Sequence, residues 1–502
     1  MLPLLIASQI READAHTIAN EPIASIDLME CASKAFTGWF INHFPDQAQV
    51  IAVYCGTGNN GGDGLAIARM LHDHQYKKIN VLIARFSSKS TDDFNINLKK
   101  IKETDISVVE ITAGESFPEE SSDVIIDALL GTGLNKPLEG DYKRLVNHIN
   151  VAHKTVVAVD VPTGFFSEGA LPKDAVIMRA DLVITFQQPK INFLLPESAP
   201  WIKCWEAVNI GLDEKFIQSL NSPYAAVQEK DIRKMLKPRR RFSHKGTYGH
   251  ALIVAGKAET MGAALLSASA CVYTGAGLTT VCVPQSGLTA LNTYMPEIIA
   301  IVRHELEVPP IKWANFNALA VGPGLGTDDF ALALLTDILT NYAKPIVIDA
   351  DALNLLAANS SKLWPSVAPN SILTPHMKEF DRLFGDHENW WQRIETGMHK
   401  AKERSVCILL KNDYTLIFTP QGKVYFNTTG NPAMATGGMG DVLTGIIASL
   451  LAQGYTPVEA CIIGAYIHGK AGDELALPNR LNAVLPSQVA GQLPVTMAKL
   501  MA

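Results

Sequence analysis

The chain has 502 residues, of which 47% are hydrophobic and 19% are charged, and its formal net charge is −7. Its length exceeds one ordinary hydrophobic core, so two or three domains are expected, and its negative charge gives no reason to expect a nucleic-acid partner. Because the seven cysteines show no CxxC spacing and no apolar run reaches the ~18 residues of a membrane span, we expect a cytoplasmic protein without disulfides, a zinc site or a membrane partner.

The first half of the chain predicts an α/β fold. After a helical opening at roughly 8–42, short and continuous apolar runs alternate with helical stretches. Continuous runs are typical of strands buried on both faces of a parallel sheet, so the pattern predicts a Rossmann-like three-layer sandwich. The predicted strands are 50–55, 79–84, 123–130, 154–162 and 181–186.

A polar and turn-prone passage at 211–224 separates this half from a second series of the same kind. We therefore expect domains at 1–215 and 225–502. Two helical stretches, at about 440–453 and 456–475, close the second series. Its predicted strands lie within 251–256, 278–284, 317–326, 344–353, 371–376, 406–411 and 415–418.

A glycine-rich stretch, "GTGNNGGDG" at 56–64, follows the first predicted strand and precedes a helix. Its first six residues match GxGxxG in the context that dinucleotide binding requires. Arg85 stands where an NAD-binding domain would place an acidic residue for the ribose. We expect a flexible loop with a dinucleotide and a cation against its backbone; the alternative is a tight turn without a ligand.

Polar residues also follow other predicted strands of the first half. In open α/β sheets, ligands bind beyond the carboxyl ends of the strands, where Asn60, Asp127 and Thr163 would converge. Their hard oxygen donors suit a hard cation. Asp160 follows another strand. Each aspartate taken alone has an alternative interpretation as a helix cap or turn residue.

The motifs "NNGGDG", "DALLGTG" and "VDVPTG" resemble those of the NAD(P)H-hydrate epimerase domain, over about the first 210 residues. The resemblance implies interconversion of the two epimers of hydrated NADH and NADPH, called NADHX and NADPHX. It implies that Asn60, Asp127 and Thr163 bind K⁺, with threonine at 163 where the family usually has serine. Asp160 is our candidate acid–base group. The implied substrate-binding residues are Asn59, Asn60, Gly61, Gly62, Asp63, Gly131, Thr132, Gly133, Leu134, Asn135, Lys136, Pro137 and Asp160.

The strongest pattern of the second half is "NPAMATGGMGDVLTG" at 431–445, a glycine-rich turn that runs into an apolar helix. Backbone N–H groups at the start of a helix stabilise developing negative charge. Asp441, in the first turn, can accept a proton from a nearby hydroxyl. Such a site suits phosphoryl transfer to an alcohol. The alternative is a helix start that Asp441 merely caps.

This turn resembles the anion-hole motif of the ribokinase-like superfamily, and 240–475 resembles its ADP- or ATP-dependent NAD(P)H-hydrate dehydratases. The matching stretches include "AVGPGLG", "VIDADALNLL" and "LTPHMKEF". Two residues depart from the family pattern, Asn412 and Met439, and both concern the nucleotide side. By resemblance, the hydrated substrate contacts Ala263, Gly324, His376 and Asp441, and the adenine nucleotide contacts Lys411, Asn412, Asp413, Tyr414, Thr415 and Gly440.

Together these resemblances imply a bifunctional repair enzyme for NADHX and NADPHX, with K⁺ and with ADP or ATP as phosphoryl donor. We expect Mg²⁺ because phosphoryl transfer needs its charge neutralised, and a homo-oligomer because domains of this kind commonly form symmetric ones. Asp441 would be the base of the dehydratase. His468 and Lys470 are expected only to cap and cover a helix. Two alternatives stay open: a small-alcohol kinase fused to a nucleotide-sensing domain, and a dehydratase whose first half only binds or oligomerises.

Overall fold

The computed structural model describes residues 1–21, 23–304 and 308–502, and the chain divides into two compact units. The N-terminal unit comprises Pro3–Ser222 and Asn389–Trp391. The C-terminal unit comprises Met1–Leu2, Pro223–Glu388 and Gln392–Ala502. Within the described ranges, no helix combines the length and the apolar character that crossing a membrane requires.

The N-terminal unit is built on a parallel sheet of seven strands, as far as the described residues show, in the order β4-β3-β2-β5-β6-β7-β8. Every residue of β2 and β5 is buried, as expected for central strands covered on both faces. The strand order reverses between β2 and β5, which makes their carboxyl ends the expected place for a ligand. The strands are β2 (Ile51–Cys55), β3 (Ile79–Arg85), β4 (Ser107–Thr112), β5 (Val124–Ala128), β6 (Thr155–Val159), β7 (Ala180–Phe186) and β8 (Ile202–Val208).

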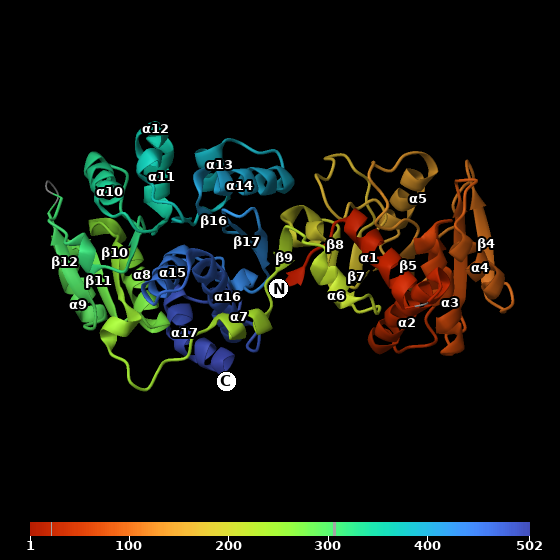
Figure 1. Cartoon of the computed structure of the whole chain (residues 1–502). Helices are drawn as coiled ribbons and strands as arrows, with labels where there is room; N and C mark the ends of the chain where they lie inside the picture. Colours follow the sequence, from red (N-terminus) through yellow and green to blue (C-terminus); the bar gives the residue numbers. More distant parts are fainter. Residues whose placement is uncertain (22, 305–307) are drawn as a thin grey trace. The chain divides into compact units, whose positions relative to one another are not determined.

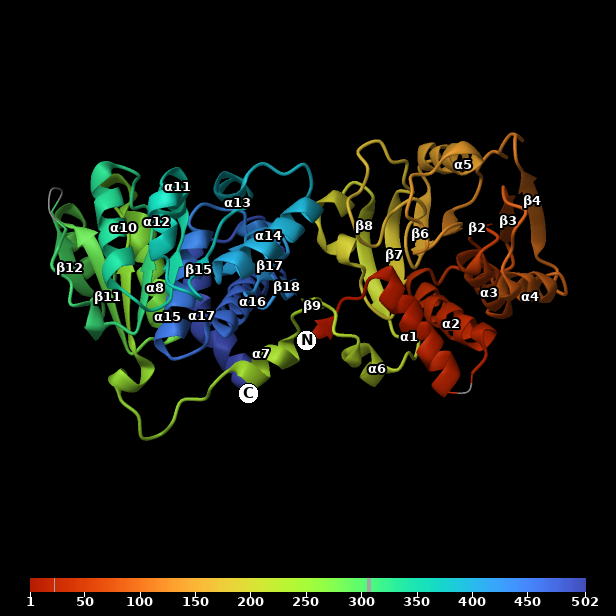
Figure 2. The ribbon, with the colours of Figure 1, turned by 45° about the horizontal axis from the view of Figure 1, so that its top comes forward.

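Helices cover both faces of this sheet (Figures 1 and 2). One core joins the strands to α2 (Ser25–His43), α3 (Asn59–Asp73) and α4 (Asp92–Ile101) through side chains such as Phe40, Leu65 and Phe94. The opposite core joins them to α5 (Gly140–Val151). A small apolar cluster packs α1 (Ala7–Asn20) against α6 (Glu214–Ser219). The result is the three-layer α/β sandwich that the sequence predicts.

The C-terminal unit contains a larger sheet of eleven strands within the described ranges, in the order β1-β9-β18-β17-β16-β15-β14-β13-β10-β11-β12. Neighbours from β12 to β16 run parallel, whereas β17 is antiparallel to β16 and to β18. The strands are β1 (Leu2–Pro3), β9 (Tyr224–Ala226), β10 (His250–Val254), β11 (Leu278–Pro284), β12 (Ile299–Arg303), β13 (Ala318–Val321), β14 (Ile346–Ile348), β15 (Ile372–Leu373), β16 (Cys407–Leu410), β17 (Thr415–Phe418) and β18 (Val424–Asn427).

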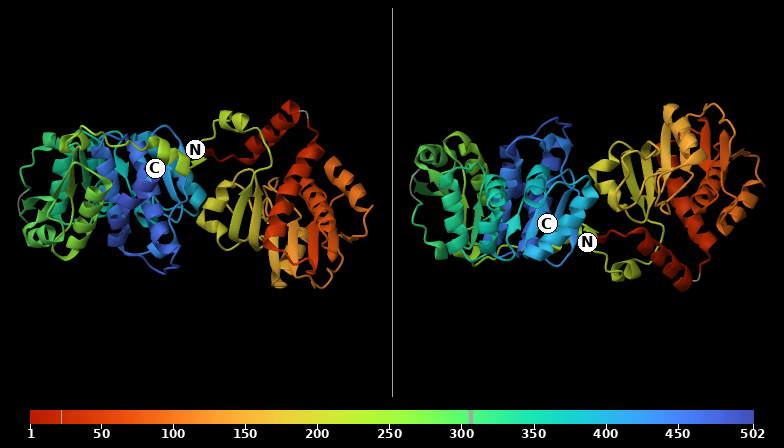
Figure 3. Two further views of the ribbon diagram at one scale, coloured as in Figure 1. Left: turned by 90° about the horizontal axis from the view of Figure 1, so that it is seen from below. Right: turned by 90° about the horizontal axis from the view of Figure 1, so that it is seen from above.

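Two groups of helices cover the faces of this sheet. Seen from below, the blue helices α15–α17 lie in front of it, and seen from above, the teal helices α10–α13 do so (Figure 3). The most apolar helix, α15, packs on α8 and on the buried strands β10 and β13. The helices are α7 (Glu229–Met235), α8 (Met261–Thr274), α9 (Leu288–Tyr294), α10 (Asp329–Asn341), α11 (Ala350–Ala358), α12 (Ser360–Leu363), α13 (Met377–Phe384), α14 (Trp390–Arg404), α15 (Met439–Ala452), α16 (Pro457–Ala476) and α17 (Pro486–Met501).

Candidate active sites

A cavity of about 670 Å³ lies in the N-terminal unit at the point where the strand order reverses. Its wall combines residues of α1 and α2 with the start of α3, the turn after β5 and the segment after β7. The volume falls within the ordinary range for small-molecule and cofactor sites. The carboxyl edge of this sheet therefore carries a cavity of the size that a small-molecule or cofactor site requires.

The glycines of 56–64 have a structural role different from the expected flexible loop. Helix α3 already begins at Asn59, and none of these glycines has a positive φ. A Cβ atom on Gly61 would lie 1.9 Å from the carbonyl oxygen of Gly56, and one on Gly64 would lie 2.6 Å from the Cβ of Ala128. The prediction of a flexible loop is wrong: glycine is required because the helix packs this closely on the sheet.

The structure places part of the predicted epimerase residues on the cavity wall. Gly61 and Gly62 lie in the first turn of α3 and do not line the cavity, and a Cβ atom on Gly62 would meet the side chain of Met29. Asn135, Lys136 and Pro137 do not line the cavity either. The predicted residues that do line it are Asn59, Asn60, Asp63, Gly131, Thr132, Gly133, Leu134 and Asp160.

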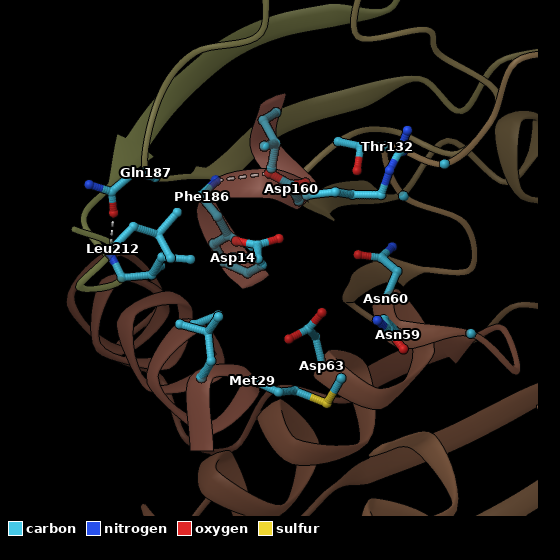
Figure 4. A pocket seen from close by; sticks show the side chains of 18 of the residues that line it. Asp14, Met29, Asn59, Asn60, Asp63, Thr132, Asp160, Phe186, Gln187 and Leu212 are labelled. Carbon is cyan, nitrogen blue, oxygen red and sulfur yellow. Dashed lines mark hydrogen bonds between the residues drawn. The ribbon is translucent and has the colours of Figure 1, made fainter. Parts of the chain in front are cut away.

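Three carboxyl groups project into this cavity from different elements, those of Asp14, Asp63 and Asp160 (Figure 4). Asp160 is anchored through Oδ1, which lies 2.8 Å from the Nζ of Lys190 and accepts hydrogen bonds from the Thr185 hydroxyl at 3.0 Å and the Phe186 N–H at 2.9 Å. Its φ of 63° lies in a region that residues other than glycine rarely adopt. The fold thus fixes this carboxylate in a strained position at the cavity wall.

The other two carboxyl groups are perturbed by their surroundings. Burial and the neighbouring charge of Asp160 raise the pKa of Asp14 to about 6, against the opposing effect of Lys190. Burial raises the pKa of Asp63 well above its usual range, and Asp160 adds to this effect. Sequence reasoning missed Asp14 and Lys190. Lys190 follows a strand end and was open to the argument used for Asp127, whereas no motif marks Asp14.

The predicted cation ligands lie around the turn that follows β5. The carboxylate of Asp127 accepts hydrogen bonds from the Thr163 hydroxyl at 2.7 Å and from the Thr163 N–H at 2.8 Å. Asn60 lies next to Gly131, and its side-chain nitrogen is buried without a hydrogen-bond partner among the described residues. Burial raises the pKa of Asp127 to about 6 despite the hydrogen bonds from Thr163 and Leu129.

The donors around Asp127 are compatible with a hard cation. Asp127 is a fully buried carboxylate that has no ion pair with any residue the structure describes. Because amide oxygen and nitrogen are assigned from hydrogen bonding, a flip of the Asn60 amide would present its oxygen where the orphaned nitrogen now lies. No group of three or more His, Cys, Asp or Glu side chains suited to a metal ion occurs in the described part of the chain. The side chains of Asp127, Thr163 and Asn60 offer oxygen donors, which suit a hard cation.

In the C-terminal unit, the carboxyl ends of four neighbouring strands bring the second predicted set together. Gly324 follows β13, Asp349 follows β14, His376 follows β15 and Lys411 follows β16. Gly324, with a φ of +57°, lies so close to α8 that a Cβ atom on it would be 3.0 Å from that of Ala263. His376 and Lys411 form an isolated parallel bridge. The residues predicted from scattered motifs thus share one sheet edge.

Asp441 lies in the first turn of α15, next to this edge. The helix starts after Gly438, whose φ of 99° is left-handed, and no side chain caps its N–H groups. Burial is the main cause that raises the pKa of Asp441 to about 7. The carboxylate of Asp349 also raises this pKa, and the charge of Lys411 lowers it. A carboxyl group with this pKa can accept a proton near neutral pH.

Asp349, which motif reasoning did not single out, organises the surroundings of Asp441. It is 1% exposed and accepts hydrogen bonds from the Lys411 ammonium at 2.9 Å and the Thr444 hydroxyl at 2.7 Å. A Cβ atom on Gly440 would lie 3.2 Å from the Lys411 Nζ, so the glycine turn packs against this ion pair. The ammonium group of Lys411 is therefore paired with the carboxylate of Asp349, and a bound nucleotide would have to share it with that carboxylate.

Two histidines lie at this site, one exposed and one with a buried ring nitrogen. His376 is exposed and caps α13, where its Nδ1 accepts hydrogen bonds from the Lys378 and Glu379 N–H groups. His468, expected only to cover a helix, has a buried Nε2 without a hydrogen-bond partner among the described residues. Burial and then the charge of Lys411 lower the pKa of His468 to about 4, so it is neutral.

The remaining predicted nucleotide residues form the turn between β16 and β17. Asp413 is exposed, and the Thr415 hydroxyl donates to the carbonyl of Asn412 at 3.4 Å. Tyr414 stands between them in the turn. This turn follows Lys411 directly, so it lies at the same sheet edge as Asp441.

Comparisons with known proteins agree with the geometry of both units. A family model described as NAD(P)H-hydrate dehydratase matches residues 251–494, and one described as YjeF-related protein N-terminus matches residues 25–192. The protein named bifunctional NAD(P)H-hydrate repair enzyme Nnr in Moorella thermoacetica is 34% identical over 517 residues, which cover 99% of this chain and 97% of that protein. The protein of the same name in Coxiella burnetii is 35% identical, with 93% and 94% covered.

Among solved structures, a ribokinase-like superfamily protein from Enterococcus faecalis is similar to the C-terminal unit. It is 28% identical, has a TM-score of 0.50, and the match covers 55% of this chain and 96% of that chain. The expectation of a ribokinase-like second domain is confirmed.

Proposed function

The chain belongs to the family of bifunctional NAD(P)H-hydrate repair enzymes, with an epimerase and a dehydratase domain, and on that premise we propose which residues carry out each reaction. The first reaction interconverts the epimers of NADHX and NADPHX in the cavity of the N-terminal unit. The second removes water from the S epimer at the edge where Asp441 lies, with ADP as phosphoryl donor and AMP and phosphate as products.

Asp160 is the proposed acid–base group of the epimerase. Its Oδ1 is occupied by Lys190, Thr185 and Phe186, whereas its Oδ2 accepts no hydrogen bond from any residue the structure describes. The anchored carboxylate can therefore exchange a proton with a substrate in the cavity without changing its own position. The substrate would lie along Asn59, Asn60 and the turn 131–134, with its phosphates near the uncapped start of α3.

Asp127, Thr163 and Asn60 would hold K⁺ beneath this cavity. A bound cation supplies positive charge that neutralises the buried carboxylate of Asp127 and the phosphates nearby. The residues themselves keep the turn after β5 in place, because Thr163 joins Asp127 to the N–H of Leu130 through its hydroxyl.

Asp441 is the proposed base of the dehydratase. It accepts the proton of the ring hydroxyl, whose oxygen forms a bond to the terminal phosphorus of the donor while the bond from that phosphorus to the bridging oxygen breaks. The phosphate then leaves with the electrons of the C–O bond, and loss of the proton on the adjacent carbon restores the double bond. The N–H groups of α15, uncapped by any side chain, stabilise the charge that develops on the phosphoryl oxygens.

The single observation that carries this assignment is the set formed by Asp349, Lys411 and Thr444 beside Asp441. The ion pair of Lys411 and Asp349 places one cation and one anion next to the proposed base. The pKa of Asp441, about 7, suits a proton acceptor at neutral pH. Ala263, Gly324 and His376 would contact the hydrated substrate, and the turn 411–415 with Gly440 the nucleotide. Mg²⁺ would neutralise the donor phosphates.

We also propose a cytoplasmic location and a homo-oligomeric state. The described cysteines, all seven, are free thiols, which suits a reducing compartment. Leu477, Leu485 and Val495 are large exposed apolar side chains around α17 and suit a contact between copies of the chain. Sedimentation analysis of the purified chain tests the second proposal, and a monomer at micromolar concentration contradicts it.

The test of the two activities is the recovery of dihydronicotinamide absorbance from a mixture of both NADHX epimers. We expect full recovery with ADP, since each epimer reaches the dehydratase through the epimerase. Recovery with ATP alone would identify ATP as the donor and contradict ADP. Recovery that stops at the share of one epimer would contradict the role of the first unit, and no recovery with either donor would contradict the assignment of the second.

A further inference from the structure

Asp14 reaches the epimerase cavity from α1, outside the range 25–192 that the family model matches. In the view of Figure 4, its carboxyl group lies below Asp160 and above Asp63. No residue of the described chain forms a hydrogen bond or ion pair with this carboxyl group. Asp14 therefore has no structural partner that explains a carboxylate in the cavity wall.

The charged groups that face Asp14 come from several elements. Asp160 and Lys190 follow β6 and β7, and Asp63 belongs to α3. Asp93 of α4 and Arg11 of α1 also line the cavity. Burial and Asp160 raise the pKa of Asp14 to about 6, so a fraction of this group is protonated near neutral pH.

Asp14 and Asp160 differ in a way that suits opposite roles. Three donors hold Asp160, and Lys190 balances its charge. Asp14 has neither a donor nor a cation in contact. One carboxyl group is thus prepared to accept a proton and the other to donate one, which is the usual division of acid–base work between two carboxyl groups in one site.

We propose that Asp14 is the second proton-transfer group of the epimerase and that it faces Asp160 across the substrate ring. The proposal rests on the epimerase function proposed for this cavity. Asp14 donates its proton to the ring hydroxyl, and the C–O bond breaks with its electron pair on oxygen, which leaves as water. The lone pair of the adjacent ring nitrogen forms a C=N bond. Water then adds to the other face of the carbon, the C=N electrons return to nitrogen, and the proton of the water passes to Asp160.

This sequence is balanced without any oxidant or co-reactant. One proton moves from Asp14 to Asp160, one water leaves and one adds, and the product is the other epimer. The opposite conversion runs through the same steps with the two carboxyl groups exchanged. Asp63 is the less suitable donor, because it is only 9% exposed and its carboxylate faces the hydroxyl of Ser33.

The test uses the full chain without ADP or ATP, so that dehydration does not consume the substrate. The conversion of one purified NADHX epimer is followed by chromatography, with the spontaneous rate subtracted. We expect Asp14→Asn to lower the epimerase kcat about 100-fold while KM stays within about threefold. The wild-type rate should fall as pH rises above about 6, because Asp14 loses its proton, and this limb should be absent in Asp14→Asn and present in Asp14→Glu.

Glu12→Gln is the matched control, since Glu12 is exposed on the same helix and does not line the cavity. Dehydratase activity of each variant on the S epimer verifies that the chain is folded. The proposal is overturned if Asp14→Asn keeps the wild-type rate, if only KM changes, if Glu12→Gln loses as much activity, or if the pH limb disappears in Asp63→Asn instead. A wild-type chain that does not interconvert the epimers would refute the proposed function itself.

Discussion

Replacing Gly61 by alanine tests whether close packing, and not backbone freedom, explains the glycine-rich stretch. The new Cβ would lie 1.9 Å from the carbonyl oxygen of Gly56. Because ordinary contact begins at about 3.4 Å, the start of α3 must move by about 1.5 Å, the difference between the two distances. Overpacking of this kind costs about 1–3 kcal/mol, and displacement of binding groups by ~1 Å can lower activity about 100-fold.

The assay measures two quantities on the full chain, the free energy of unfolding in urea and the rate of epimer interconversion. Gly38→Ala is the matched control, because Gly38 is an exposed residue inside α2 with no atom within 4 Å of the added Cβ. That variant should be more stable by about 0.5–1 kcal/mol. Dehydratase activity should survive in both. A Gly61→Ala chain with wild-type epimerase rate and stability would refute the packing argument.

Three further predictions concern the two sites. The dehydratase kcat/KM should fall as pH drops below about 7, approaching tenfold per unit, because a base with a raised pKa becomes protonated there; a rate independent of pH from 6 to 8 contradicts Asp441 as the base. Asp160→Asn should lower epimerase activity by about 100-fold or more and leave the dehydratase intact, as followed with purified epimers; equal loss of both activities would indicate unfolding instead. Exchange of K⁺ for tetramethylammonium should slow the epimerase of the wild type but not the residual activity of Asp127→Asn, and an ion-independent wild type would contradict the cation site.

The sequence predicted most of the central strands, although it missed β18, and it predicted the edges of the sheets poorly. The strands that begin at Ile51, Val124 and Thr155 are buried in the middle of a sheet, so they appear as continuous apolar runs. Strands β4 and β8 end the same sheet, contain one buried residue each and were missed. Strand β12 was missed for the same reason, since it is the edge of the other sheet and only Arg303 in it is buried. A pattern of buried apolar residues cannot mark a strand that has few of them.

The candidate site residues also divide into two groups, those that follow strands and those that lie within helices. The rule that ligands bind beyond strand ends led to Asp127 and Asp160, because the position along the sequence fixes which edge they occupy. Gly324 was predicted from the family resemblance alone. Asp14 and His468 lie within helices, where the sequence does not reveal which residues turn toward a distant strand end. The positions of Asp14 and His468 beside the two sites depend on tertiary packing, so the structure was needed to find them.

The first strand has a consequence for dividing the gene. Leu2 belongs to the C-terminal unit, and β1 lies beside β9 at the edge of the eleven-stranded sheet, although the residues that follow belong to the N-terminal unit. A fragment that starts at Pro223 therefore lacks its own border strand, and the backbone of β9 becomes an open template for association with other chains. Separate expression of the dehydratase should succeed better when the residues of β1 are grafted ahead of β9 than when the gene is cut at the boundary alone.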